Sequence, residues 1–421
     1  MQSKKNGISA NKIHRLSLII YFILSISLIL GLILGEDSSG GGSIIDFHST
    51  WILVEKLFDP QSMRFEFKFP LHYWIASIIF KILNNVFLFK LFYVLMTLFL
   101  PFLFYKCLEI KFSDVEKNKL FLFSLILLLL PSVRTSAVWP NTQITAIFFF
   151  LISIYYFLKW EQLNDFVKIN KSLMLALTFM SLAVYTRQIY ALIYLYFVFI
   201  FYKKFSFKKF LQVCLIILIF AIPGLIFVII WPIILQVTFD SSLQNSLLVN
   251  LSIISFYLVP FFFIIFALNK KKFILDNKFF IFSTLSIIFI FISSNYFDYN
   301  LKMGGGVLMK VSILLIGDYK LFFLSSFLGL ISCYLLCKNN LSNIVLTLLI
   351  IFGISAYAIF QKYYEPMMLI LMFLIYKNDD FKIFLKKKLN IFLFLLYFFS
   401  YLISAILFEF YNVKENLLLT Q

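Results

Sequence analysis

Residues 16–34 read LSLIIYFILSISLILGLIL, an apolar run that no charged residue interrupts. At 1.5 Å per residue, a helix of this length crosses the ~30 Å hydrocarbon core of a bilayer. Lysines and Arg15 precede the run, as in a secretory signal peptide. The run is longer than the apolar region of such a peptide, however, and no convincing small-residue cleavage site follows it. It therefore predicts a first membrane span that is retained.

The composition of the whole chain points to the same class. Of its 421 residues, 62% are hydrophobic and 14% are charged, and the mean hydropathy is +0.96. Soluble domains are about half apolar and about a quarter charged, so this chain has too little polar surface for a soluble fold. Its four cysteines have no metal-type spacing supported by histidines, and we expect them to be packing residues.

The net charge of +17 would suit a protein that binds nucleic acid. The lysines occur instead in short clusters between apolar runs, as the positive-inside rule expects of cytoplasmic loops. We therefore expect no nucleic-acid partner and a cytoplasmic N-terminus. The usage of lysine, asparagine and isoleucine is typical of an AT-rich bacterial genome, which predicts a multi-pass protein of the bacterial inner membrane.

The run 71–83 decides on which side every later loop lies. Its 13 residues are too few to cross a bilayer, so it predicts an interfacial or re-entrant helix. The lysine clusters at 203–209, 270–272 and 386–388 are then cytoplasmic; if 71–83 were a span, all three would lie outside.

With that side fixed, the sequence predicts an all-α polytopic membrane protein with about thirteen transmembrane helices and interfacial helices in its first outer loop. No linker, repeat or appended soluble domain divides the chain, so we expect one transmembrane domain over 1–421. Besides 16–34, the expected spans are 86–105, 120–133, 142–158, 172–186, 189–202, 210–238, 246–268, 279–296, 319–337, 341–360, 366–376 and 389–410.

The first outer loop, 36–70, holds six of the twenty acidic residues. Asp46 differs from the other five because it lies in the apolar and aromatic sequence IIDFHSTW, residues 44–51. A carboxylate in such surroundings at a membrane interface is costly unless it has a partner or a role. Asp46 is therefore the candidate catalytic residue.

Arginine is rare in this lysine-rich chain. Only four arginines occur, and three of them fall in expected outer loops. Their planar fork of donors suits bidentate binding of phosphate or carboxylate, although anchoring at a helix end would also explain them. We expect an anionic ligand at the outer surface, bound by residues drawn from the outer loops and their edges: His48, Arg64, His72, Arg134, Trp139, Asn141, Arg187, Gln188, Tyr190, Gln361, Lys362 and Glu365.

The order of these features resembles the bacterial GT-C glycosyltransferases, namely the protein O-mannosyltransferase and aminoarabinose-transferase type of glycosyltransferase family 39. Members carry an Asp-Glu pair in the first outer loop and a His-Pro-Pro-Leu-x-Tyr segment after it. This chain has Asp46-Phe47 and then Phe69-Pro70-Leu71-His72-Tyr73. The first carboxylate is kept, the second is lost, and the histidine follows the proline. The resemblance covers roughly 16–200, with 35–70 as the outer loop and 201–421 as additional helices.

The resemblance implies an inverting enzyme that takes a sugar from a polyprenyl-phosphate donor to a lipid, glycan or protein acceptor on the extracytoplasmic face. Asp46 would be the general base that deprotonates the acceptor hydroxyl. Arg134 and Arg187 match no motif of the family, so their role at the donor phosphate rests on charge alone. No metal site is expected for certain; a divalent cation would draw ligands from Glu36, Asp37 and His48.

Two other functions stay open. A polymerase or ligase of surface polysaccharide would also act on lipid-linked sugars, but it would rely on a long late outer loop, and no late loop here is long. A flippase or transporter would carry charged or interrupted helices at span midpoints, paired across inverted repeats. Pro223-Gly224 and Trp231-Pro232 are the obvious interruptions, and they lack a matching pair.

Overall fold

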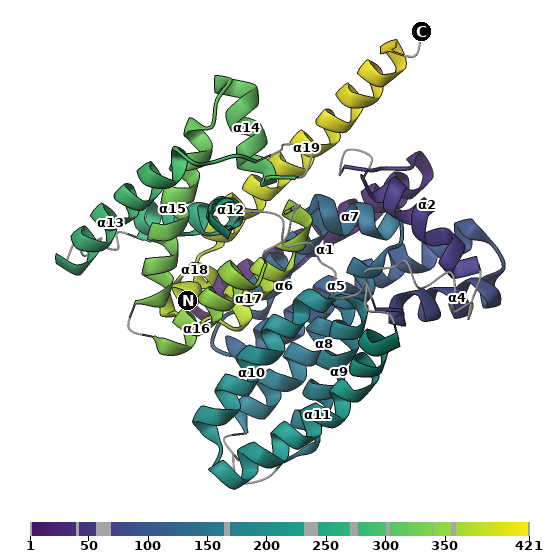
Figure 1. The fold of residues 1–421 in the computed structure, drawn as a ribbon, viewed down its shortest axis with the longest axis horizontal. Helices are drawn as coiled ribbons and strands as arrows, with labels where there is room; N and C mark the ends of the chain where they lie inside the picture. Colours follow the sequence, from purple (N-terminus) through teal and green to yellow (C-terminus); the bar gives the residue numbers. More distant parts are fainter. Residues whose placement is uncertain are drawn as a thin grey trace. The chain divides into compact units, whose positions relative to one another are not determined.

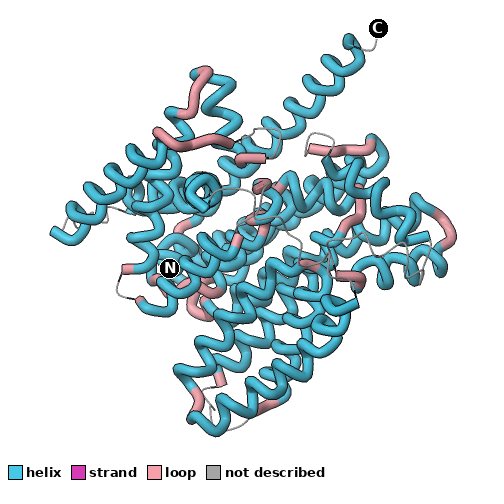
Figure 2. Tube along the Cα trace, in the orientation of Figure 1, coloured by secondary structure: helices cyan, strands magenta, loops and turns pink. Residues whose placement is uncertain are grey.

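The computed structural model of the chain is helical throughout the part that it describes (Figure 2). That part covers residues 2–38, 42–55, 69–163, 169–230, 243–269, 277–299, 304–338, 340–354 and 359–419. Within these ranges no strand forms, and an isolated bridge joins Gly304 to Ile359. The all-α prediction is confirmed.

The chain divides into two compact units. Unit 1 comprises Met1–Tyr190, Phe205–Leu235 and Leu385–Gln421, and unit 2 comprises Ala191–Lys204 and Gln236–Phe384. The helices of unit 1 are α1 (Gln2–Leu34), α2 (Gly42–Glu55), α4 (Leu71–Leu83), α5 (Val86–Lys111), α6 (Lys117–Ser124), η1 (Leu125–Leu129), α7 (Pro131–Val138), α8 (Thr142–Gln162), α9 (Lys171–Thr186), η2 (Gln188–Tyr190), α11 (Phe207–Ile230) and α19 (Lys388–Leu419). Those of unit 2 are α10 (Ala191–Lys204), α12 (Leu243–Asn269), α13 (Asn277–Ser294), α14 (Gly306–Ile316), α15 (Lys320–Cys337), α16 (Leu341–Gly353), η5 (Gln361–Tyr363) and α17 (Met367–Leu374), and α18 (Asp379–Lys386) crosses the boundary.

Eight of the described helices are long and apolar enough to cross a membrane, which makes the chain a polytopic membrane protein. They are Arg15–Leu34, Val86–Lys111, Thr142–Gln162, Phe207–Ile230, Asn245–Leu268, Asn277–Ser294, Lys320–Cys337 and Lys388–Glu409. The expected count of thirteen is not confirmed. Four other expected spans form α9, α10, α16 and α17, whose 8 to 16 residues are short for a bilayer.

The run 71–83 forms α4, a helix of 13 residues, so the prediction of a short helix there is confirmed. The expected span at 120–133 is instead a bent pair, in which Lys117–Leu129 and Pro131–Val138 meet at 64°. Proline explains the break, because it disfavours helical backbone at the residue before it, and Leu130 is extended. Counting this pair as one span gives nine.

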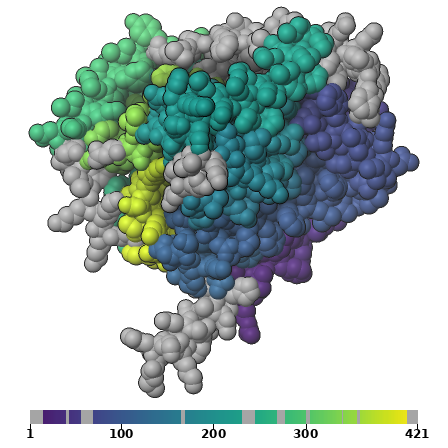
Figure 3. Space-filling model, turned by 90° about the horizontal axis from the view of Figure 1, so that it is seen from below, coloured from purple at the N-terminus to yellow at the C-terminus, as the bar shows by residue number. Residues whose placement is uncertain are grey.

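In unit 1, α5, α8, α9 and α11 lie side by side (Figure 1). Figure 3 shows these helices, blue to teal, in close contact on one face of the molecule. Contacts between the ends of these helices distinguish the two ends of the unit. At one end Lys117 pairs with Glu109, Lys386 pairs with Asp114, and Trp160 packs on Phe205.

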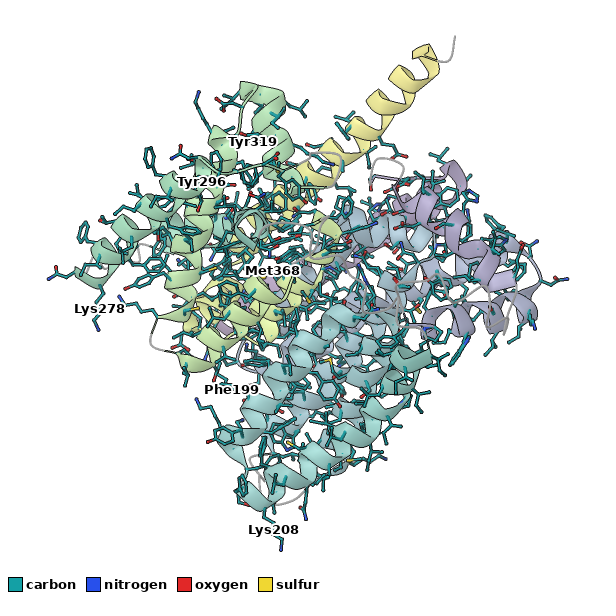
Figure 4. All side chains as sticks on the ribbon, in the orientation of Figure 1. Phe199, Lys208, Lys278, Tyr296, Tyr319 and Met368 are labelled. Atoms are coloured by element: carbon teal, nitrogen blue, oxygen red, sulfur yellow. The ribbon has the colours of Figure 1, made fainter. Side chains whose placement is uncertain are left out.

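We call this the lysine end, because the helix ends and loops there carry Lys106, Lys111, Lys117, Lys119, Lys159, Lys171, Lys208, Lys209, Lys386, Lys387 and Lys388. Lys208 points away from the helices at the start of α11 (Figure 4). The first-loop helices α2 and α4 lie at the opposite end, where α4 meets the end of α9.

Unit 2 is built on the contact between α12 and α15. Its seam is made of small residues, as in many membrane helix pairs: Ser252 and Ser325 share a hydrogen bond of 2.6 Å, and a Cβ on Gly329 would meet the carbonyl oxygen of Leu251 at 2.2 Å. On α12, the buried Asn250 donates through Nδ2 to the carbonyls of Ile351 and Ile354, both at 2.8 Å. These carbonyls end α16 and have no partner within that helix.

We predict that Asn250→Leu destabilises unit 2 by about 1–3 kcal/mol, because it leaves these two carbonyls without their donor. A lowered thermal unfolding midpoint of the purified protein in detergent would measure the loss. Ser255→Ala is the matched control on α12, since among the described residues the Ser255 hydroxyl bonds only to the carbonyl of Ser252 in its own helix. Equal midpoints for Asn250→Leu and the control would contradict the prediction.

Candidate functional site

The helix that carries Asp46 lies on the surface of unit 1, with one face buried. Phe47, Thr50 and Val54 on α2 are buried, while His48 and Ser49 are exposed. This spacing of three and four residues is that of an amphipathic helix. The Ser77 hydroxyl on α4 donates to the carbonyl of Val54 at 2.6 Å and ties the end of α2 to α4.

Aromatic rings gather around the middle of α2. The ring of Phe47 lies 5.7 Å from that of Trp139, the residue that ends α7, and 5.2 Å from that of Trp51. The His48 ring lies 6.0 Å from the Trp139 ring. Asp46, which is half-buried, and His48 flank Phe47 in the chain. Two of the predicted ligand residues, His48 and Trp139, therefore lie together, and Asp46 is two residues before His48 on the same helix.

A cation that the sequence did not single out completes this cluster. The Nζ of Lys90, in the first turns of α5, lies 3.4 Å from the centroid of the Trp139 ring and 4.9 Å from that of Phe47. Lys90 is half-buried and makes no ion pair with any residue that the structure describes. The signal was available in the sequence, because Lys90 is the one charged residue in the apolar run 86–105.

We call Asp46, Phe47, His48, Lys90 and Trp139 the α2 cluster. It joins a carboxylate, an imidazole, an ammonium group and two large rings at one end of a membrane bundle. A lysine over a tryptophan face gains a cation–π interaction and stays able to bind an anion on its other side. The arrangement combines a group that accepts protons with a cation, which is the pairing that transfer from a phosphate leaving group needs.

Arg134 has another partner. Arg134 lies on α7 and binds both carboxylate oxygens of Glu36: its Nε donates to Oε1 at 2.8 Å and its Nη2 donates to Oε2 at 2.6 Å. It also binds Ser27, because Nη1 donates to the Ser27 hydroxyl at 3.0 Å and Nη2 donates to the Ser27 carbonyl at 3.2 Å. The side chains of Arg134 and Glu36 are 3% and 10% exposed. This bidentate pair uses most of the guanidinium donors inside the protein, so Arg134 stands inward of the surface where an anionic ligand was expected.

The pair also positions the α2 cluster. The Trp139 Nε1 donates to the backbone carbonyl of Glu36 at 3.1 Å, so the residue that binds Arg134 also orients the indole. Ser27 belongs to α1, and Glu36 is the second residue after the end of that helix. One buried ion pair thus joins the end of α1 to α7 and holds Trp139 beneath Lys90.

Two further predicted ligand residues have structural partners. His72 on α4 is 2% exposed, and its Nδ1 lies 2.9 Å from the hydroxyl of Thr145 on α8. Asn141 caps α8, accepting from the amide of Gln143 at 2.9 Å and donating to the hydroxyl of Ser136 at 3.1 Å. His72 thus connects α4 to α8, and Asn141 connects α7 to the start of α8.

Arg187, Gln188 and Tyr190 follow the end of α9. Arg187 is its C-cap and donates its backbone amide to the carbonyl of Ala183 at 2.8 Å. Gln188 and Tyr190 belong to η2, and the buried Tyr190 ring packs 4.7 Å from that of Phe150. Arg187 and Gln188 are half-buried at the end of α9 that meets α4.

The remaining predicted ligand residues do not belong to this cluster of unit 1. Gln361 and Lys362 form part of η5 in unit 2, where the Gln361 amide donates to the Tyr257 hydroxyl at 3.0 Å. Glu365, also in unit 2, is 2% exposed. Arg64 lies outside the described residues.

Metal ligands do not gather in the described part of the chain: no three His, Cys, Asp or Glu side chains there are placed to hold an ion. Glu36, one of the expected ligands, is engaged by Arg134. An open groove of about 280 Å³ lies between α13 and α15 in unit 2, but its lining of Ile, Leu and Phe side chains with Ser294 carries no acid or base. Among the described residues, the α2 cluster is therefore the candidate functional site.

Comparison of the chain with protein-family models, curated proteins and solved structures finds no match. The resemblance to GT-C enzymes stays a prediction from the sequence.

We predict that breaking the Glu36–Arg134 pair from one side, by Glu36→Gln or Arg134→Gln, costs about 3–5 kcal/mol, because a buried charge loses its counterion. The joint replacement Glu36→Leu with Arg134→Met should cost less than either single change. Thermal unfolding and the monodisperse fraction after extraction measure both effects. Wild-type stability in Arg134→Gln would show instead that Arg134 is available to a ligand.

Proposed function

We propose that the chain is a membrane glycosyltransferase that moves a sugar from a polyprenyl-phosphate donor to an acceptor hydroxyl on the extracytoplasmic face. The observation that carries the proposal is the α2 cluster: Lys90, which has no ion pair among the described residues, lies over the rings of Phe47 and Trp139, and Asp46 directly precedes Phe47 on α2. The proposal also draws on the resemblance of 16–200 to GT-C enzymes.

In this mechanism Asp46 accepts the proton of the acceptor hydroxyl. The freed oxygen attacks the anomeric carbon, the bond from that carbon to the phosphate oxygen breaks, and the lipid phosphate leaves with the electron pair. A positioned general base typically contributes 10²–10⁴-fold to such a step. His48 is exposed and two residues from Asp46, which supports a role for it in binding the acceptor.

Lys90 is the group that we propose for the donor phosphate. Negative charge grows on the leaving phosphate as the glycosidic bond breaks, and a fixed cation stabilises it most where water is partly excluded. Lys90 is half-buried and held over Trp139, and no described acid neutralises it. It takes the role that the charge argument from sequence gave to Arg134; Arg187 remains a second candidate.

The charge distribution of unit 1 supports the outer location of the cluster. The lysine end carries eleven lysines, and cytoplasmic loops are where membrane proteins keep lysine. The α2 cluster lies at the other end. A cytoplasmic lysine end therefore puts Asp46 and Lys90 on the side where lipid-linked sugars are used.

A second function, a flippase or transporter, has one observation in its favour. The bent pair of α6–η1 and α7 breaks at Leu130, and its second arm carries Arg134, which forms the buried ion pair with Glu36. Broken helices beside buried charges are typical of transporter binding sites. Movement of a lipid-linked sugar across liposome membranes by the purified protein, without transfer of the sugar, would favour this function over the first.

We predict that Asp46→Asn abolishes sugar transfer, by at least about 10²-fold, because the amide cannot accept the acceptor proton. The measurement is transfer from polyprenyl-phosphate sugars by purified protein in liposomes. Glu55→Gln is the matched control, a carboxylate-to-amide change on the exposed face of the same helix. Wild-type turnover by Asp46→Asn with an intact fold would remove the base assignment.

Lys90→Met should raise KM for the polyprenyl-phosphate donor about tenfold and also lower kcat, because the charge contacts the phosphate in the ground state and in the transition state. Lys90→Arg should restore part of both. Lys81→Met, an exposed lysine at the end of α4, serves as the control. Unchanged donor kinetics in Lys90→Met would mean that Lys90 only packs on Trp139.

A further inference from the structure

The C-terminal helix of unit 1 contacts the segment that leads into α2. On α19, Oε1 of Glu409 accepts a hydrogen bond of 2.7 Å from the backbone amide of Asp37. The two residues are 372 positions apart in the chain, and Glu409 is the last residue of its apolar span. A carboxylate that accepts from a backbone amide makes a charge-assisted bond, which is stronger than a neutral one.

Asp37 in turn binds the first turn of α2 through its side chain. Its side chain is fully buried, and its Oδ2 accepts from the backbone amide of Ile44 at 2.8 Å. Ile44 lies in the first turn of α2, where amides have no carbonyl partner within the helix. A carboxylate at this position satisfies such an amide and also interacts favourably with the helix dipole.

The sequence between the two residues makes this contact important. Residues 38–42 read SSGGG, so no side chain larger than serine is available there to hold the start of α2 against the bundle. Ile44 lies two residues before Asp46 on the same helix. Whatever fixes the first turn of α2 therefore also fixes the carboxylate of the α2 cluster.

We propose that Glu409 is a positioning residue: through Asp37 it clamps the first turn of α2 and holds Asp46 in its working place. The clamp stands on the two hydrogen bonds alone, while its effect on transfer rests on the function proposed above. The C-terminal helix thus contributes to the site without touching substrate.

The clamp is tested by amide hydrogen exchange of the full-length protein in lipid nanodiscs. Glu409→Ala should raise exchange in residues 43–48 about tenfold and leave α5 and α8 unchanged, because only the contact to Asp37 is lost. Glu409→Gln should exchange nearly as the wild type does, since its amide oxygen still accepts from Asp37. Ser404→Ala is the control, because Ser404 is exposed and, in the part of the chain that the structure describes, its hydroxyl bonds only to the carbonyl of Ser400 within α19.

Wild-type exchange in residues 43–48 of Glu409→Ala would overturn the clamp. Should that variant not fold, Asp37→Ala gives the same test from the other bond, and unchanged exchange at Ile44 in Asp37→Ala would overturn it equally. An equal rise in Glu409→Ala and Glu409→Gln would also count against the clamp, because the lost feature would then be the charge and not the acceptor.

Transfer assays separate this inference from the proposed function. Glu409→Ala should lower kcat about tenfold with donor KM unchanged, and Glu409→Gln should restore it. A wild-type kcat in Glu409→Ala, together with raised exchange in α2, would overturn the positioning role. If the wild type transfers no sugar but the exchange pattern is as expected, the clamp stands and the proposed function fails.

Discussion

The hydrocarbon core of a membrane offers no hydrogen-bond partner to the backbone, and the structure of this chain depends on that constraint. Backbone groups within a helix bond to one another, so only the amides and carbonyls at the helix ends lack partners. Asparagine side chains solve it in unit 2: Asn250 donates to the last carbonyls of α16, and Asn343 donates to the carbonyls of Leu336 and Lys377. Ordered helix ends then allow short helices such as α16 to pack inside the unit.

The same constraint acts more strongly on charges. Glu36 and Arg134 are almost completely buried, and each is tolerated only because the other is present with the Ser27 oxygens beside it. Their pairing joins α1 to the second arm of the bent pair and orients Trp139. Arg134, which the sequence suggested as a ligand-binding residue, is thereby engaged in a structural ion pair, and the half-buried Lys90 of α5 lies over the Trp139 indole.

The α2 cluster combines residues from several distant parts of the chain. Asp46 and His48 come from α2, Lys90 from α5 and Trp139 from the end of α7, while Glu409 reaches the loop before α2 from the far end of the sequence. The proposed base, Asp46, lies on the short surface helix α2, whereas Lys90 and Glu409 lie on helices long enough to span a membrane. In such an arrangement a surface element carries the functional side chain, and rigid helices hold that element in position.

The sequence by itself determined the all-α membrane class, the short helix at 71–83 and the unusual setting of Asp46, because apolar runs and helix length are local properties that the bilayer thickness converts into structure. Tertiary structure alone decided the partners. Neither the pairing of Arg134 with Glu36 nor the placement of Lys90 over Trp139 follows from spacing in the chain, since each depends on which helices lie side by side. The sequence also could not show that the apolar run 120–133 bends at Leu130, or that α9, α10, α16 and α17 are short for a membrane span. A helix packed inside the protein is apolar just as a helix that faces lipid is, so an apolar run alone does not predict a membrane crossing.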